Sequence, residues 1–228
     1  MPGSTLLLLG SGPGIGLSIA KTFSVRGFTH IALVSRNAER LAKDQDEVLD
    51  AIQERGYSCQ VRTYPCDLSD LSALDKVLKE VESFGSLECV VFNAARVDGK
   101  PPGEESVEAI EADFRLTNLS LYHVALWALP LLKTRTSSLP SLLVTNSLLY
   151  KEPYPPFMSL SLTKTAQRSL VQSLNAAYGK EVHVGLITVG GQVSPEAKNL
   201  NPENIAEKTY EFYKQKRGQW GLEVEILE

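Results

Sequence analysis

Short apolar runs alternate with longer segments of helical periodicity along most of the chain. The runs at 5–9, 30–34 and 87–92 are rich in Leu, Val and Ile, whereas residues 70–84 repeat apolar side chains every three or four positions. Continuous apolar runs are typical of strands in a parallel sheet that helices cover on both faces. The alternation therefore predicts an α/β fold, a doubly wound parallel sheet, in a single domain over residues 1–228.

The same patterns predict the rest of the elements in outline. Asn37 is expected to cap the second helix, and Gly85 to end the helix at 70–84. The other expected helices are 15–25, 104–132, 158–178 and 202–216. The other expected strands are 58–64, 141–147, 181–189 and 223–227.

The composition favours a soluble globular protein over a nucleic-acid-binding or membrane-spanning one. The 228 residues are 43% hydrophobic and 22% charged, which is ordinary for a soluble globular protein. The net charge of −4 gives no reason to expect a nucleic-acid partner. We expect no membrane span and no secretory signal, because the longest apolar run near the start is Leu6–Leu9 and no basic segment precedes it. Cys59, Cys66 and Cys89 lack metal-ligand spacing, so we expect no metal and a reducing, cytoplasmic location.

A glycine-rich stretch, Leu9-Gly10-Ser11-Gly12-Pro13-Gly14-Ile15-Gly16, joins the first expected strand to the first expected helix. Glycines there let the backbone approach a pyrophosphate closely, and the helix N-terminus favours negative charge. The strand–turn–helix context indicates a Rossmann-type nucleotide site. The alternative is a glycine-rich turn kept for packing. The residues expected to contact a cofactor here are Gly10, Ser11, Gly14, Ile15 and Gly16.

The second expected strand ends at Ser35 and Arg36 without a carboxylate. An acidic residue near this point would bind the ribose 2′-hydroxyl of NAD, whereas a guanidinium suits the 2′-phosphate of NADP. We therefore expect NADP(H) as the cofactor. The alternative is that Arg36 is a solvated surface residue.

Further motifs resemble the short-chain dehydrogenase/reductase family over almost the whole chain. Leu9–Gly16 matches its Thr-Gly-x-x-x-Gly-x-Gly turn, with Leu9 replacing Thr. Asn93-Ala94-Ala95 is what remains of its Asn-Asn-Ala-Gly segment after the fourth strand. The other positions that carry the resemblance are Asp67, Leu68, Asn118, Ser147 and Lys164.

The main departure from the family pattern is at Leu160. The family's catalytic Tyr stands four residues before the Lys and commonly 13 after the Ser, and both spacings lead to Leu160. A literal Tyr-x-x-x-Lys at Tyr210–Lys214 lies on the final expected helix and is predicted to be a packing feature.

The resemblance implies roles for the retained residues. Ser147, Lys164 and Asn118 are the expected catalytic residues, and Lys164 would also bind the nicotinamide ribose. Asp67 and Leu68 would lie at the adenine, and Asn93 would stabilise the sheet beside the cofactor.

A different group could replace the missing phenol as proton donor. The side chains considered are Tyr150, Tyr154, His123, Ser159 and Ser161, each of which could equally be structural. Lys164 itself could polarise an oxygen or act as a base.

The second departure is a shortened substrate lid. Residues 189–193 stand where the family has a Pro-Gly segment and commonly a longer loop. The site is expected to be open on that side, with Val193 near the nicotinamide carboxamide.

These observations leave three functional hypotheses. The first is an atypical NADP(H)-dependent oxidoreductase of a small organic molecule. The others are a non-redox enzyme on the same fold, such as an isomerase, lyase or cyclase, and an NADP(H)-binding regulatory protein. Two apolar helices, at 119–132 and 170–174, predict a homodimer or homotetramer.

Overall fold

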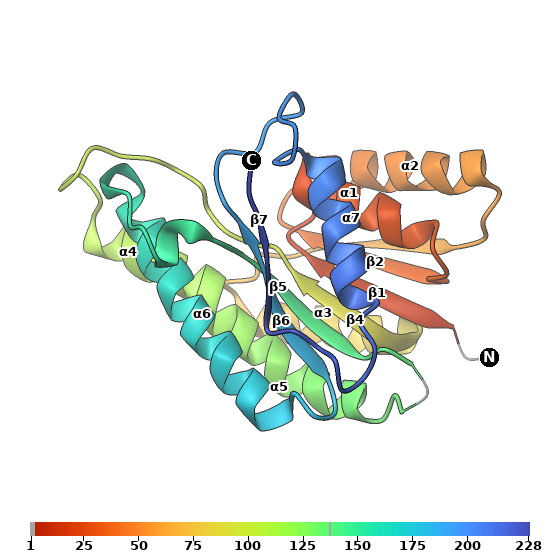
Figure 1. The fold of residues 1–228 in the computed structure, drawn as a ribbon. Coiled ribbons are helices and arrows are strands. Elements are labelled where there is room, and N and C mark those ends of the chain that lie inside the picture. Colours follow the sequence, from red (N-terminus) through yellow and green to blue (C-terminus); the bar gives the residue numbers. More distant parts are fainter. Residues whose placement is uncertain (1–2, 137) are drawn as a thin grey trace.

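The structure, a computed structural model, describes residues 3–136 and 138–228. Seven strands form one sheet in the order β3-β2-β1-β4-β5-β6-β7, and every neighbouring pair is parallel (Figure 1). The strands are β1 (Ser4–Leu9), β2 (His30–Ser35), β3 (Gln60–Pro65), β4 (Ser86–Phe92), β5 (Ser141–Ser147), β6 (His183–Val189) and β7 (Glu223–Ile226). The predicted doubly wound sheet is confirmed.

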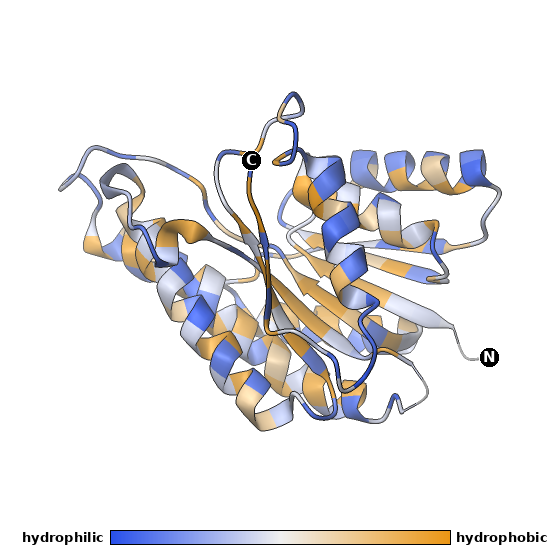
Figure 2. Ribbon diagram, in the orientation of Figure 1, coloured by the Kyte–Doolittle hydropathy of each residue, from blue (hydrophilic) through white to orange (hydrophobic). Residues whose placement is uncertain are grey.

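Helices cover both faces of this sheet. The α-helices are α1 (Ile15–Ser24), α2 (Ala38–Arg55), α3 (Leu71–Phe84), α4 (Val107–Phe114), α5 (Ser120–Lys133), α6 (Met158–Tyr178) and α7 (Pro202–Tyr213). One apolar core lies between the sheet and α1, α2 and α7, and another between the sheet and α3, α5 and α6. Figure 2 shows the central strands almost entirely in hydrophobic colours, because their side chains are buried on both faces.

Local sequence signals set several helix boundaries. The Asn37 side chain accepts a hydrogen bond from the Arg40 backbone N–H at the start of α2. The Asp70 carboxylate accepts hydrogen bonds from two backbone N–H groups at the start of α3. Both are capping interactions that a side-chain oxygen at this position is expected to make.

The expected single helix at 104–132 is different in the structure. It begins only at Val107, because the Ser106 hydroxyl caps it through the Ala109 N–H. A π-helical turn, η1 (Arg115–Leu119), then separates α4 from α5. The turn contains Asn118, whose side-chain amide donates to the Thr163 carbonyl on α6, 3.1 Å away. A π-turn of this kind is frequent at functional sites.

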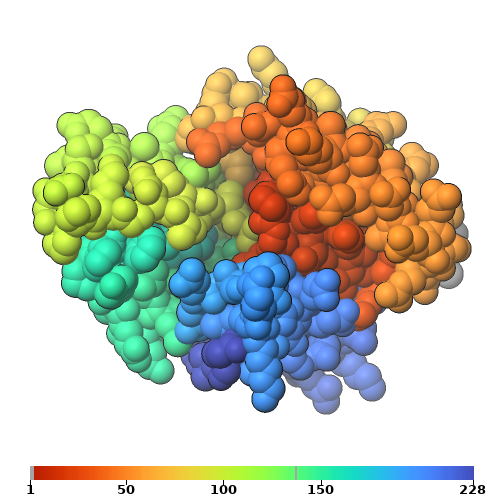
Figure 3. All heavy atoms as spheres, turned by 90° about the horizontal axis from the view of Figure 1, so that it is seen from above, coloured from red at the N-terminus to blue at the C-terminus, as the bar shows by residue number. Residues whose placement is uncertain are grey.

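The carboxyl ends of the parallel strands lie along one edge of the sheet, where ligands of open α/β folds bind. Figure 3 looks onto this edge. It shows a hollow between the start of the chain, in red, and the segment that precedes α4, in yellow-green.

Candidate active site

The turn between β1 and α1 is built by close approach of backbone segments. Gly10 and Gly14 have φ values of 94° and 100°, which favour glycine. A Cβ on Gly10 would lie 2.5 Å from the Ala94 backbone nitrogen, and one on Gly16 would lie 2.6 Å from the Gly10 carbonyl oxygen. A Cβ on Gly12 would instead meet no protein atom within 4 Å, so this part of the turn faces open space.

Ser11 is engaged inside the protein. Its hydroxyl donates to the Asp44 carboxylate at 2.7 Å, and Asp44 is fully buried on α2. The other oxygen of Asp44 accepts from the Arg40 guanidinium at 2.6 Å. The Ser11 side chain therefore fixes the turn against α2, and only its backbone remains for a ligand.

Four residues expected around an adenosine lie at or just after the ends of β2 and β3. Arg36 is exposed and Ser35 half-buried at the end of β2. Asp67 follows β3, and hydrogen bonds from the hydroxyl and backbone N–H of Ser69, together with the charge of Arg36, hold its pKa below the usual value although burial opposes this. Leu68 is buried beside it. Arg36 and Asp67 thus follow two adjacent strands, β2 and β3.

Asn93 joins three strands at the centre of the sheet edge. Its side-chain amide donates to the Gly10 carbonyl at 3.0 Å, and its oxygen accepts from the Thr145 hydroxyl at 3.0 Å. These bonds link the ends of β1, β4 and β5. Asn93 can therefore stabilise the sheet although the family's neighbouring Asn and Gly are absent.

Ser147 and Leu160 lie at the end of β5 and the start of α6. Ser147 is the last residue of β5, and its Oγ accepts from the Leu149 N–H at 3.3 Å. Leu160 lies in the first turn of α6 with 8% of its surface exposed. A hydrocarbon side chain thus occupies the position at which both sequence spacings place the phenol.

The hydroxyl groups beside Leu160 are already bonded within the protein. Ser159 donates to the Asp113 carboxylate at 2.6 Å, and Ser161 donates to the Phe157 carbonyl at 2.8 Å. On α5, the His123 Nε2 lies 2.7 Å from a carboxylate oxygen of Asp75 on α3. Each of these interactions gives the side chain a structural role.

The two tyrosines considered as donors lie in the segment after β5. The Tyr150 ring is covered by the Arg168 guanidinium, 4.0 Å from the ring centre, whereas Tyr154 is 54% exposed. The literal Tyr-x-x-x-Lys pair lies elsewhere. The Tyr210 hydroxyl donates to the Arg26 carbonyl on the opposite face of the sheet.

Lys164 is buried, with 5% of its surface exposed. Its Nζ donates to the Thr145 carbonyl at 2.8 Å and to the Gln167 side-chain oxygen at 3.0 Å. Burial lowers the pKa of the ammonium group from 10.5 to about 7. The nearby Asn118 side chain holds the α6 backbone through its amide, and among the described residues its buried Oδ1 has no hydrogen-bond partner.

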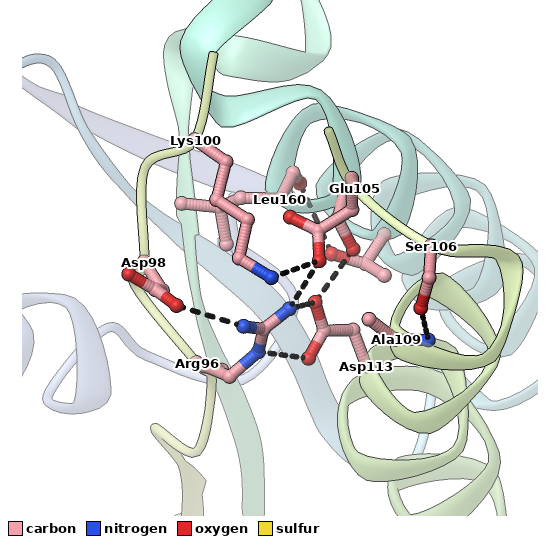
Figure 4. A network of polar contacts seen from close by, with 10 residues as sticks. Arg96, Asp98, Lys100, Glu105, Ser106, Ala109, Asp113 and Leu160 are labelled. Carbon is pink, nitrogen blue, oxygen red and sulfur yellow. Dashed lines mark hydrogen bonds and ion pairs between the residues drawn. The ribbon is translucent and has the colours of Figure 1, made fainter. Parts of the chain in front are cut away.

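A charged cluster ties the segment before α4 to α6 (Figure 4). The Arg96 guanidinium donates two 2.7 Å hydrogen bonds to Asp113 and a 3.1 Å bond to Glu105. These interactions raise the pKa of Arg96 above its usual value, so the group stays charged. Asp113 also accepts from Ser159, so the cluster reaches the residue next to Leu160.

The loop between β6 and α7 covers residues 190–201. Val193 lies half-buried in it, against the core under α1, α2 and α7. Its later part is held by the Glu228 carboxylate, which accepts hydrogen bonds from three successive backbone N–H groups, those of Lys198, Asn199 and Leu200. α7 follows directly, and its Pro202 lies 3.9 Å from where a Cβ on Gly14 would stand.

The described residues, 3–136 and 138–228, lack two further features that would bear on function. No group of three or more His, Cys, Asp or Glu side chains in this part of the chain is arranged to hold a metal ion. None of the helices in it is long and apolar enough to cross a membrane.

The geometry fits a dinucleotide. The glycine turn leaves open space over Gly12 at the start of α1, where the first backbone N–H groups have no partner within the helix. Arg36 stands at the end of β2, where an adenosine ribose would lie. The orphaned Asn118 oxygen and the buried Lys164 ammonium lie on the other half of the site.

Sequence reasoning missed three polar residues of this region. Asp44 is fully buried on an otherwise apolar face of α2, Gln167 is fully buried on a face of α6 that also carries Thr163 and Lys164, and Arg96 follows the Asn-Ala-Ala segment. The available signal for Asp44 was a polar residue within an apolar helical stripe. Asp44 falls between Leu41 and Val48 in this way.

A comparison with known sequences gives the family. The profile of the short chain dehydrogenase family matches residues 4–205. A fatty acyl-CoA reductase from Acinetobacter baylyi is 35% identical over 95 residues, 41% of this chain and 30% of that protein. A hydroxynaphthalene reductase from Aspergillus fumigatus is 33% identical over 129 residues, 56% of this chain and 45% of that protein. The chain thus matches less than half the length of these curated relatives.

Solved structures agree with this assignment. An alcohol dehydrogenase from Thermococcus sibiricus, complexed with 5-hydroxy-NADP, superimposes with a TM-score of 0.81 at 25% identity, covering 97% of this chain and 95% of that one. A metagenomic short-chain oxidoreductase in complex with NADP has the same fold, with a TM-score of 0.85 at 20% identity over 99% and 97% of the two chains. The chain therefore belongs to the short-chain dehydrogenase family.

Proposed function

We propose that this protein is an atypical NADP(H)-dependent oxidoreductase of a small organic molecule, working without the family's catalytic phenol. The fold, the glycine turn and the family membership support a nicotinamide cofactor. The exposed Arg36 at the end of β2 supports NADP(H) over NAD(H), and the structural neighbours include complexes with 5-hydroxy-NADP and NADP beside one with NADH.

The residues that would hold the cofactor come from the ends of five strands, β1, β2, β3, β4 and β6, and from α6. The backbone of the turn, at Gly10, Ser11, Gly14, Ile15 and Gly16, would bind the pyrophosphate. The residues expected around the adenosine are Ser35, Arg36, Asp67 and Leu68, and those expected around the nicotinamide half are Asn93, Lys164 and Val193. A bound nicotinamide supplies or accepts a hydride.

The remaining chemistry belongs to the protein's own side chains. The Ser147 hydroxyl can donate a hydrogen bond to a substrate heteroatom. The Lys164 ammonium can bind ribose oxygens, and Asn118 can orient a water through its free oxygen. A general acid typically contributes about 10²–10⁴ in rate, and Leu160 contributes none of this.

The observation that carries the proposal is Leu160 in a site whose neighbouring hydroxyl groups are engaged. Ser159 and Ser161 already donate to protein oxygens, so neither is a free acid. Reduction of a carbon–carbon or carbon–nitrogen double bond needs less help at an oxygen than ketone reduction does. We therefore favour such substrates. The same observation favours, as a second candidate, a non-redox reaction in this pocket.

The test is hydride transfer from NADPH deuterated at C4 to a panel of ketones, enones and imines, followed by mass spectrometry. We expect deuterium in enone or imine products. We expect Leu160→Tyr to gain ketone reduction by about 10²–10⁴-fold, the size of an acid–base contribution. Leu162→Tyr is the matched control, because Leu162 is on the same helix and 52% exposed.

The outcomes separate the hypotheses. Absence of deuterium transfer to every ketone, enone and imine of the panel would contradict the oxidoreductase proposal. Product formation without cofactor consumption would then support the isomerase, lyase or cyclase alternative. Tight NADPH binding without any turnover would support a regulatory protein.

We also propose that the chain forms a homodimer or homotetramer in the cytoplasm. Leu119, Tyr122 and Leu126 follow each other at helical spacing and are 42%, 47% and 56% exposed. An apolar stripe of this kind suits a second copy of the chain. Three free thiols fit a reducing compartment. A monomeric mass at micromolar concentration in solution scattering would contradict the association.

A further inference from the structure

The Lys164 ammonium group lies among neutral hydrogen-bond acceptors. Its two contacts are the Thr145 carbonyl of β5, at 2.8 Å, and the side-chain oxygen of Gln167, at 3.0 Å. Gln167 is three residues further along α6, so both side chains leave the same face of the helix. An ammonium group has three N–H donors, and these two contacts use two of them.

Gln167 is itself held in one orientation. It is fully buried, and its amide nitrogen donates to the Thr117 carbonyl of the π-helical turn at 3.3 Å. Because an amide has its donor and acceptor on opposite branches, this bond turns the Gln167 oxygen toward Lys164. The π-helical turn is therefore linked through one side chain to the ammonium group.

The side chains that bond to α6 next to this contact are neutral amides. Asn118 of the π-helical turn and Asn146 of β5 bond to the α6 backbone at Thr163 and Lys164. In the described part of the chain, no carboxylate bonds to the Lys164 ammonium. Carbonyl acceptors favour the charged form of a buried amine, whereas burial disfavours it and lowers the pKa of Lys164.

We propose that Gln167 is a positioning residue for Lys164, holding its ammonium group at the end of β5 so that the third N–H remains for the cofactor ribose. The consequence for cofactor binding rests on the proposed function, whereas the positioning itself does not. A residue with an apolar side chain at 167 would leave the ammonium with the Thr145 carbonyl alone.

The test uses two substitutions and a matched control. Gln167→Met keeps the length of the side chain and removes the carbonyl, and Gln167→Glu keeps the shape and adds a charge. Gln172→Met is the control, because Gln172 is exposed on the same helix. The first measurement is an NMR titration of lysines labelled with ¹³C at Cε in the cofactor-free protein, with Lys164 assigned from Lys164→Arg.

We expect the Lys164 titration midpoint to fall by about half a unit or more in Gln167→Met, to rise in Gln167→Glu and to stay unchanged in Gln172→Met. The second measurement is the NADPH dissociation constant against pH. At pH 7, the affinity of the protein for NADPH is expected to weaken about five- to tenfold in Gln167→Met, which corresponds to the loss of roughly one hydrogen bond.

The outcomes distinguish the inference from the proposed function. If Lys164 titrates identically in all variants, the positioning role is wrong. If its midpoint shifts as expected but the native protein binds no NADPH, the positioning role stands and the proposed cofactor is wrong. If Gln167→Met does not fold, Gln167→Glu decides, since an unchanged midpoint in it would equally overturn the inference.

Discussion

Replacing Arg96 by Met tests whether the charged cluster before α4 holds this segment against α6. Arg96 donates to Asp113 twice and to Glu105 once, and both carboxylates are nearly buried, with 8% of each side chain exposed. Methionine keeps much of the apolar stem of arginine and removes the charge. Asp113 is then left with the Ser159 hydroxyl alone, whereas Glu105 keeps Lys100 at 3.2 Å.

The expected cost comes mainly from Asp113. Removing one partner of a buried ion pair typically destabilises a protein by about 3–5 kcal/mol, because the other charge stays buried and unpaired. The Arg96 side chain is 31% exposed, so we take the lower end, about 3 kcal/mol. For a chain of this size, this corresponds to a fall in Tm of roughly 6–12 °C.

The assay is thermal and urea unfolding followed by circular dichroism at pH 7. Asp98→Asn is the matched control, since Asp98 bonds to the same guanidinium at 3.0 Å but its side chain is 54% exposed. An exposed pair contributes about 1 kcal/mol or less. Equal loss of stability in Arg96→Met and Asp98→Asn would refute the reasoning, because burial of Asp113 would then not decide the cost.

Three further predictions follow from individual residues. Gly16→Ala is expected to destabilise the fold, since its Cβ would lie 2.6 Å from the Gly10 carbonyl oxygen. Gly12→Ala should keep the native Tm and bind NADPH about tenfold or more weakly. Thermal unfolding and NADPH titration check both, and a larger loss of Tm in Gly12→Ala than in Gly16→Ala would contradict this. Burial lowers the pKa of His183 to about 4. The free energy of unfolding should therefore fall by about 3 kcal/mol as the pH falls from 6.5 to 4, and this contribution is fully present above pH 6.5. Urea unfolding of His183→Asn should lack this pH dependence. Glu228→Gln should speed hydrogen exchange of the three amides that the carboxylate holds before α7, and unchanged exchange would show that this contact does not restrain the loop.

The sequence was sufficient to predict the sheet and most of its helices. The Leu-rich runs of β1 and β4 could only belong to strands buried on both faces, and Asn37 and Asp70 act as caps through their own neighbours. Such signals are local, so a pattern along the chain contains them. The bounds of α6, Met158–Tyr178, agree with the prediction for the same reason.

The details of the site depend instead on contacts between distant elements. The helix start at Val107 reflects Ser106, and the π-helical turn contains an Asn118 that bonds across to α6. Ser11 is expected to contact the cofactor, and its hydroxyl donates to Asp44, 33 residues away. No periodicity along one segment reveals a partner of this kind.

The most direct test of the central claim is a calorimetric titration of the native protein with NADPH and NADH, alongside Arg36→Gln. The account predicts that NADPH binds at least tenfold more tightly than NADH and that Arg36→Gln removes most of this preference, because the 2′-phosphate loses its guanidinium. Absence of binding to either dinucleotide, or equal affinity for both in the native protein, would contradict it.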